Sequence, residues 1–445
     1  MSHGYGYGFG RPRYRRPRAL SPLREHLRDT FWFAPTAGLV TVALLWWAAS
    51  SLDAALISAL QEDGAYDEVG ELVGITEDAK TIITTVSSAM MTFIGVVFSI
   101  SLVAVQMASG QFSPRVVRIF VRSRITKLTF AVFLATFVLS LLVMAEYESE
   151  TDPRLVVSVP LVQSLLTMAM VGLSLLLFIA YVNSTLRLMR VSHVIDHITH
   201  ESFWVLSRQE RKFAEEAELG PETGQIAHDG RAGVLRDVNI ARLVRAARRR
   251  GVVLRLIPRI GDFVVPGTPV LAVHGGQAPP RSALRYTVSV GVERTFHQDL
   301  GFGLRQLADI ALRALSPAVH DPTTAVQALD RIIQFLAASV DLPLGALHHR
   351  DRQGEVRLVQ DVPGWVDLVD LGLTEIRGCA PGNPQVSRRM MAGIEDLLHL
   401  APVDPVDRRR PLLRHRELLV QAVERTVPEA ADREFALLSD RQGIG

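Results

Sequence analysis

The chain has 445 residues, enough for about two or three domains. Hydrophobic residues make up 48% of it and most of the excess lies before Asn183, which disfavours a purely soluble protein. The formal net charge is +2, but the charges are unevenly distributed along the chain. The single cysteine, Cys379, excludes an internal disulfide and a metal site built from several cysteines.

Residues 1–28 are predicted to form a disordered basic arm. The segment is rich in Gly, Tyr and Arg and has no apolar period. Its arginines are suited to anionic lipid headgroups, at about 1 kcal/mol for each well-placed side chain. The alternative is a solvated tail that only helps to set the membrane topology.

Residues 29–182 are predicted to form a transmembrane domain. A bilayer core is crossed by about 20 apolar residues in a helix, and four stretches qualify. They cover about residues 31–52, 81–107, 128–145 and 159–182. The first is long enough to span and lacks the small-residue pattern of a cleavage site, so none is predicted to be a cleavable signal.

The charges of the loops alternate in sign along the chain. Arginines stand before the first span, after the second and after the fourth, whereas the segments after the first and third spans are rich in Asp and Glu. Basic flanks mark the cytoplasmic side, so both termini are predicted to be cytoplasmic. Only three of the 48 basic residues are lysine, a bias typical of bacterial genomes with high GC content. We therefore expect a bacterial inner-membrane location.

The rest of the chain is predicted to be a cytoplasmic mixed α/β domain. Residues 183–219 continue the fourth span as a juxtamembrane helix, residues 220–400 mix strands and helices, and residues 401–445 form a helical tail. The hairpin Gly261–Val270 resembles those of biotinyl- and lipoyl-type small β-barrels, so a small β-barrel-like part is expected. Lysine attachment of such a cofactor is excluded because no lysine follows Lys212.

Two helices with defined starts are expected in this domain. The first spans about 299–315, with Asp299 at its start, and the second begins with Asp321 as N-cap and Pro322 at the first helical position. Asp299 and Asp321 are therefore predicted to be structural caps. Short strands are expected near 346–349, 355–360 and 366–371.

These helices also carry a family resemblance. The segment from Gln298-Asp299-Leu-Gly through Ser316-Pro317 to Asp321-Pro322-Thr-Thr, together with Gln111-Phe-Ser-Pro-Arg115 after the second span, resembles a family of predicted bacterial membrane proteins catalogued as domain of unknown function 2254. The family pattern has an Asn before the aspartate, where this chain has His320. The resemblance implies the membrane architecture over most of the chain and brings no activity with it.

One face of the second span is polar. Its residues recur at spacings of three or four: Thr81, Thr85, Ser88, Thr92, Gly95, Ser99 and Gln106. Small hydroxyl side chains let helices approach closely and bond across the contact. In an oligomer they also suit a water-filled path for ions or small solutes. The stripe is thus predicted to be either a helix interface or a pore lining.

The second span leads into the arginines Arg115, Arg118 and Arg122. In an oligomer they would form basic rings at the inner mouth that favour anions. The simpler interpretation is that the positive-inside bias alone accounts for them.

A histidine cluster follows the fourth span. His193 and His197 have the i, i+4 spacing of two ligands on one metal, and His200 is close enough to join them. Such a cluster would also charge near pH 6 and so act as a pH sensor. The alternative is a solvated polar helix face.

No catalytic motif is found. The chain has no Gly-x-Ser-x-Gly elbow, Walker motif or His-Glu-x-x-His pattern, so neither an enzyme nor a cofactor is expected. Arg245, Arg248, Arg249 and Arg250 form a basic run without interleaved aromatics, which indicates a solvated helix end or a lipid contact and not nucleic-acid binding.

The sequence favours an oligomeric membrane protein. Its expected partners are the bilayer, further copies of the chain, and a small ion or cytoplasmic ligand. The favoured function is a gated ion channel or pore with a cytoplasmic regulatory domain. The alternative is a non-conducting membrane scaffold or sensor that recruits a cytoplasmic partner.

Overall fold

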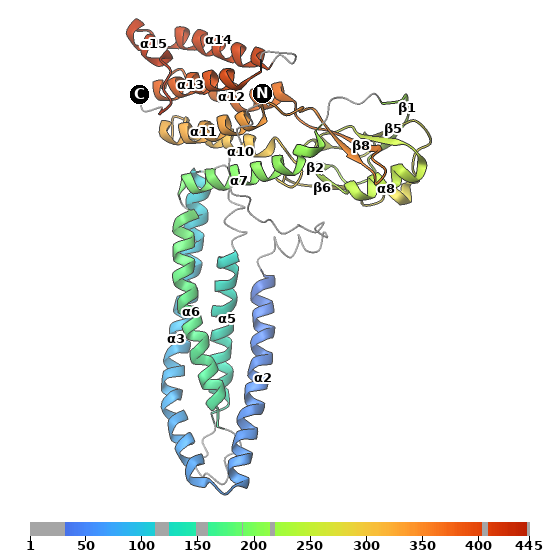
Figure 1. Ribbon diagram of the computed structural model, residues 1–445. Coiled ribbons are helices and arrows are strands. Elements are labelled where there is room, and N and C mark those ends of the chain that lie inside the picture. The colour runs from blue at the N-terminus through green and yellow to red at the C-terminus, as the bar shows by residue number, and fades with distance from the viewer. Residues whose placement is uncertain are drawn as a thin grey trace, which may run out of the picture. The chain divides into compact units, whose positions relative to one another are not determined.

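The computed structural model describes residues 32–111, 124–147, 159–188, 190–213, 219–402 and 408–442. Internal contacts divide the chain into two compact units (Figure 1). The helical unit comprises residues 1–105 and 118–186, and the α/β unit comprises residues 106–117 and 187–445. We describe each unit separately.

In its described residues, the helical unit contains four helices, each long and apolar enough to cross a membrane. They are α2 (Phe33–Glu62), α3 (Tyr66–Gln111), α5 (Arg124–Ala145) and α6 (Leu161–Leu188). The acidic segment predicted as a loop between the first two spans is itself largely helical, because α2 runs to Glu62 and α3 begins at Tyr66. Ile57 and Leu72 pack in one apolar cluster there, which accounts for the longer helices.

Apolar and aromatic contacts hold these helices together. Val42, Ile83 and Leu139 belong to one buried cluster that joins α2, α3 and α5. A second cluster is aromatic, with Phe93 edge-on to Phe178 at 5.5 Å between ring centroids. The clusters fix which face of each helix points inward.

The α/β unit contains two open sheets. The five-stranded sheet has the order β1-β5-β3-β8-β7, with β3 and β8 parallel and the other pairs antiparallel, and the three-stranded antiparallel sheet has the order β4-β2-β6. The strands are β1 (Glu222–Ala227), β2 (Gly233–Val238), β3 (Val253–Leu256), β4 (Phe263–Val264), β5 (Pro269–His274), β6 (Val288–Gly291), β7 (Ala346–Arg350) and β8 (Val356–Asp361).

The prediction of a small barrel-like part is therefore wrong, because neither sheet closes on itself. Leu235 of the smaller sheet and Leu254 of the larger sheet share one core with Leu243 of α8 (Ile240–Arg250), so the sheets pack together without closing. Strand β4 has only two residues, and it pairs with β2 while β3 and β5 continue into the larger sheet. The hairpin thus contributes strands to two sheets. A short helix, α9 (Arg281–Leu284), packs beside α8.

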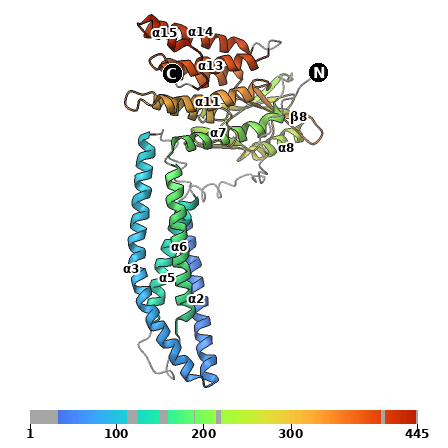
Figure 2. The same ribbon diagram turned by 60° about the vertical axis from the view of Figure 1, so that its left-hand side comes forward.

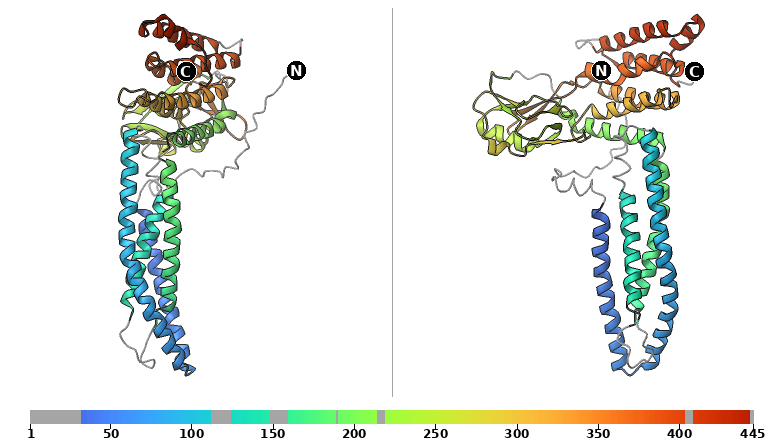
Figure 3. Two further views of the ribbon diagram at one scale, coloured as in Figure 1. Left: turned by 90° about the vertical axis from the view of Figure 1, so that its left-hand side faces the viewer. Right: turned by 180° about the vertical axis from the view of Figure 1, so that it is seen from behind.

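Helices form successive layers beside the sheets (Figures 2 and 3). α7 packs against α10 and α11, α13 packs on α11, and α14 and α15 pack on α13. Their bounds are α7 (Val191–Gln209), η1 (Glu210–Lys212), α10 (Phe302–Ala314), α11 (Pro322–Ser339), α12 (Trp365–Cys379), α13 (Pro384–Leu400), α14 (Arg409–Thr426) and α15 (Ala430–Leu437).

The strand predicted over 366–371 is part of helix α12. Leu368, Val369, Gly372 and Ile376 are buried at spacings of one, three and four residues, which is a helical period. Gly372 also sits where a Cβ would lie 2.7 Å from the Ile332 side chain, so α12 approaches α11 closely. The short apolar run was ambiguous between a strand and a helix, and tertiary packing decides for the helix.

We expect Gly303→Ala to loosen the contact between α7 and α10. An added Cβ would lie 1.7 Å from the Ser202 Oγ, whose hydroxyl donates to the Ile198 carbonyl at 2.7 Å. Overpacking of this kind costs about 1–3 kcal/mol. Thermal unfolding of the full chain should show the loss, and Ser202→Gly should restore part of it. Gly378→Ala, in α12 with open space around the added Cβ, is the matched control, and an equal loss there would contradict the prediction.

Candidate functional site

The inner face of α3 is fixed by packing inside the helical unit. Ile83, Met90, Val97 and Ala104, each seven residues apart, are all buried. The Tyr181 hydroxyl of α6 lies 3.0 Å from the Val97 carbonyl and 2.6 Å from the Ser101 hydroxyl. A seven-residue repeat stays on one side of a helix, so these contacts determine which side of α3 points away from its own unit.

The polar stripe lies on that outer side. We use the name polar stripe for Thr81, Thr85, Ser88, Thr92, Gly95, Ser99 and Gln106, all of which are exposed in the single chain. At 100° per residue they fall on the side of α3 opposite to Ile83 and Val97. The structure therefore brings these predicted site residues together on one continuous outward face of the helix.

The hydroxyls of the polar stripe bond to the backbone of α3 itself. Thr85 donates to the Thr81 carbonyl at 2.9 Å, and Ser99 donates to the Gly95 carbonyl at 2.9 Å. Ser88 and Thr92 make the same bond one turn back, at 3.2 and 3.4 Å. These four hydroxyl donors are thus satisfied, while an oxygen lone pair on each stays available for water, an ion or a second helix.

The borders of the polar stripe are apolar. Met91, Phe98 and Leu102 are exposed on one side of it, and Val96 and Val103 are exposed on the other. A Cβ added at Gly95 would meet nothing within 4 Å, so packing within this chain does not require the glycine. Small residues between apolar borders are typical of surfaces where transmembrane helices approach one another closely. The stripe holds no ionisable group and so offers no acid–base chemistry.

The predicted inner-mouth arginines Arg115, Arg118 and Arg122 lie outside the described residues.

The histidines after the fourth span lie on the exposed face of α7. His193, His197 and His200 are exposed, while the opposite face, including Val194 and Ile198, is buried. Desolvation lowers the pKa of His197, an effect that the nearby Glu201 carboxylate opposes. Within the described part of the chain, no group of three or more His, Cys, Asp or Glu side chains is arranged to hold a metal ion. The geometry therefore offers a titratable surface without a preformed metal site.

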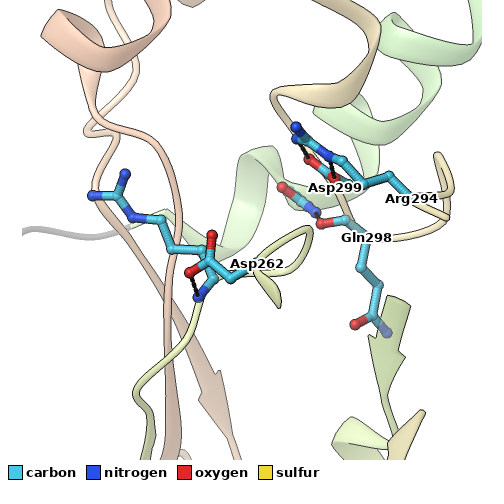
Figure 4. A network of polar contacts seen from close by, with 6 residues as sticks. Asp262, Arg294, Gln298 and Asp299 are labelled. Atoms are coloured by element: carbon cyan, nitrogen blue, oxygen red, sulfur yellow. Dashed lines mark hydrogen bonds and ion pairs between the residues drawn. The ribbon is translucent and has the colours of Figure 1, made fainter. Parts of the chain in front are cut away.

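Of the two aspartates predicted as caps, Asp321 is the N-cap of α11, whereas Asp299 lies two residues before Gly301, the N-cap of α10. Asp321 accepts the Thr324 N–H at 3.0 Å at the start of α11. Asp299 is buried just before α10 and receives two hydrogen bonds from Arg294, at 2.7 and 2.8 Å (Figure 4).

Gln298 and Gly261 both make close contacts with the segment that precedes α10. Gln298 pairs with the backbone of Val238 in β2 through both its amide oxygen, at 3.1 Å, and its amide nitrogen, at 3.0 Å. Gly261 has φ +104°, and a Cβ there would lie 2.6 Å from an Asp299 carboxylate oxygen. Asp262 accepts the Arg259 N–H at 2.8 Å in the same region (Figure 4). The polar network therefore ties the sheets to the start of α10, which is a structural role.

Asp53 is a polar residue whose position differs from the sequence-based expectation. As the first residue after the predicted span 31–52, Asp53 is expected among the acids of the following segment, but it lies within α2 and is fully buried. Its carboxylate accepts the N–H groups of Val162, at 2.7 Å, and Gln163, at 3.2 Å, in the first turn of α6. A carboxylate there also suits the positive end of the helix dipole. The signal in the sequence was Ile57, one turn later, which continues the apolar face of α2 past Asp53.

Two buried histidines occupy β7. His348 and His349 are 6% and 5% exposed, and His349 lies 3.3 Å from the Gln360 amide oxygen. Burial, with a smaller contribution from the positive charge of Lys212, lowers the pKa of His349 to about 4. The ring is therefore neutral in the folded protein at pH 7.

The depressed pKa of His349 predicts a loss of stability in acid. The unfolded chain takes up this proton near pH 6.5 and the folded chain only near pH 4, so stability falls as the pH falls through this window. The slope is about 1.4 kcal/mol per pH unit for this group. His349→Gln should flatten the pH dependence of the unfolding free energy between these values. His399→Gln, at an exposed position of α13, should leave the slope unchanged, and an unaltered slope in His349→Gln would contradict the assignment.

Comparison with known proteins connects both units to one family. A family model described as predicted membrane protein (DUF2254) matches residues 28–396. The chain is also 29% identical over 436 residues to the uncharacterized protein Rv1290c of Mycobacterium tuberculosis and to the uncharacterized protein Mb1321c of Mycobacterium bovis. Each match covers 94% of this chain and 79% of the relative. No solved structure matches it.

The matched range includes the four apolar helices and most of the α/β unit, and it contains the segments on which the family resemblance was based. The chain therefore belongs to the DUF2254 family of predicted membrane proteins.

Proposed function

We propose that copies of this membrane protein assemble through the outward face of α3 and that their polar stripes line a gated path for ions or small solutes. The observation that supports this proposal is the direction of the polar stripe. Its seven residues are exposed on the side of α3 opposite to the packed face. The span has a mean hydropathy of 2.2, yet seven of its exposed positions are polar or small. Such positions are better matched by another helix or by water than by lipid tails.

The chemistry of the stripe suits weak, uncharged contacts with a passing solute. The hydroxyls of Thr85, Ser88, Thr92 and Ser99 each keep a free lone pair after bonding to their own helix, so an ion can exchange water for these oxygens without meeting a fixed charge. Conduction requires binding that is weak enough for release. The predicted cytoplasmic α/β unit would regulate the path, since α7 begins only three residues after α6 ends and carries the exposed histidines.

The experiment is solute flux through liposomes that contain the purified full chain. We expect flux of monovalent ions, and at least a tenfold reduction in Ser88→Leu, Thr92→Leu and Ser99→Leu, because leucine fills the path and removes the oxygen. Ser51→Leu is the matched control, since Ser51 is an exposed serine of α2 whose hydroxyl bonds to the Trp47 carbonyl one turn back, as in the stripe. If an intact oligomer shows no flux under any ionic condition, the proposal of a pore is overturned.

One observation favours the second candidate, a non-conducting scaffold or sensor that recruits a cytoplasmic partner. The borders of the stripe are apolar and Gly95 leaves open space, a combination that also suits dry helix-to-helix packing. In that case the leucine variants would change the oligomeric state, and the wild type would show no flux. Both candidates describe a non-enzymatic protein of the bacterial inner membrane with cytoplasmic termini.

A further inference from the structure

A strongly basic surface is formed by α8 and α9. The exposed face of α8 carries Arg245, Arg248 and Arg249, while Leu243 and Ala247 are buried on the opposite face. Neither helix contains an acidic residue. Among the described residues, none of the ion pairs involves these three arginines. No carboxylate of the described part of the α/β unit is therefore paired with these three charges.

The two helices form one continuous surface. Arg242 of α8 donates to the carbonyls of Ala283, at 3.1 Å, and Ser282, at 3.3 Å, and so holds the two helices side by side. Arg281 and Arg285 are exposed on α9 or directly after it. We call Arg245, Arg248, Arg249, Arg281 and Arg285 the basic surface.

An exposed aromatic ring belongs to the basic surface. Tyr286 is 75% exposed, and the Arg285 guanidinium lies over its ring at 4.8 Å. Its φ of 60° is a left-handed conformation that a bulky residue seldom adopts. The Thr287 N–H donates to the Leu284 carbonyl at 3.1 Å, and a turn of this kind takes a positive φ at its third residue, so the turn accounts for the backbone of Tyr286 while its ring stays exposed.

The helix dipole accounts for only part of the charge. Cations in the last turn of a helix are stabilised by its negative end, and Arg248 and Arg249 are in the last turn of α8. Arg245 is one turn earlier, and Arg281 and Arg285 belong to a different segment, so the dipole of α8 does not explain them. The common property of the five is an outward positive charge.

We propose that the basic surface docks the α/β unit on anionic phospholipid headgroups. A guanidinium group can donate two parallel hydrogen bonds to the oxygens of one phosphate. A tyrosine ring beside such groups suits the interfacial region of a bilayer. The α/β unit is covalently tethered to a predicted membrane span, which raises the local concentration of headgroups far above that of any free polyanion. The proposal does not depend on conduction, because it concerns only this surface.

The test uses the full chain in nanodiscs with and without phosphatidylglycerol. In a Cys379→Ser background, Ala241→Cys places a fluorophore on the exposed face of α8, and a quencher attached to lipid headgroups reports docking. Quenching should appear in the anionic discs and decrease as salt is added. Arg245→Gln, Arg248→Gln and Arg249→Gln together should weaken docking about 100-fold, at about fivefold for each arginine.

The control removes the same charge elsewhere. The control is a triple variant at exposed positions outside α8 and α9: Arg352→Gln, Arg416→Gln and Arg425→Gln. This variant should dock as the wild type does. Equal quenching in neutral and anionic discs, or in both triple variants, would overturn the proposal. A DNA or RNA duplex that binds in neutral discs through Arg245, Arg248 and Arg249, with no response to phosphatidylglycerol, would assign the surface to nucleic acid and also overturn it.

Discussion

Replacing Asp53 by leucine is expected to lower the stability of the helical unit by about 3 kcal/mol or more. The substitution leaves the N–H groups of Val162 and Gln163 without their acceptor, and each buried donor that loses its partner costs about 1–3 kcal/mol. The favourable interaction of a carboxylate with the start of α6 is lost as well. Thermal unfolding of the full chain in detergent would measure the change as a lower midpoint.

Two variants separate this cap from a general effect of removing charge. Asp53→Asn keeps the shape of the side chain and one carbonyl oxygen, so it should lose only about half of the stabilisation that is lost in Asp53→Leu. Glu62→Leu removes an exposed acid at the end of the same helix and should change the midpoint little. Equal midpoints for Asp53→Leu and Glu62→Leu would show that the buried contact with α6 contributes nothing.

The sequence contained enough information for the elements that depend on composition and local spacing. The four apolar helices follow from about 20 uncharged residues each, and the cap at Asp321 follows from an aspartate before Pro322. Both signals are local, so no knowledge of the packing was needed.

The parts that failed depend on contacts between distant segments. The hairpin 261–270 has the turn residues expected of a small barrel, but its strands pair with β2 and β3, which no local pattern specifies. Asp53 looked like a loop acid because its partners, Val162 and Gln163, lie about a hundred residues away. The polar stripe could be found from spacing alone, whereas its outward direction required the packing of Val97 against Tyr181.

Replacing Gly95 by leucine is expected to weaken the assembly of copies and leave the single chain folded. A Cβ at this position meets nothing within 4 Å of its own chain, so leucine adds bulk only on the outward face of α3. Hydrogen bonds between transmembrane helices contribute about 1–2 kcal/mol each, and leucine at this position would hold the facing helices apart, so the association constant should fall about tenfold per interface. The oligomeric mass of the full chain in detergent, with thermal unfolding as the check on folding, measures both effects.

Two other glycines make the result specific. Gly172→Leu also adds bulk to an exposed position of a span, in α6, with open space around the Cβ, so it should leave both assembly and folding unchanged. Gly38→Leu points inward, where a Cβ would lie 3.1 Å from the Ala131 carbonyl oxygen, so it should lower the unfolding midpoint instead. If Gly95→Leu behaves like Gly172→Leu, α3 faces lipid and the polar stripe is not the shared interface. If it lowers the oligomeric mass while the midpoint stays, the outward face of α3 is where copies of this protein meet.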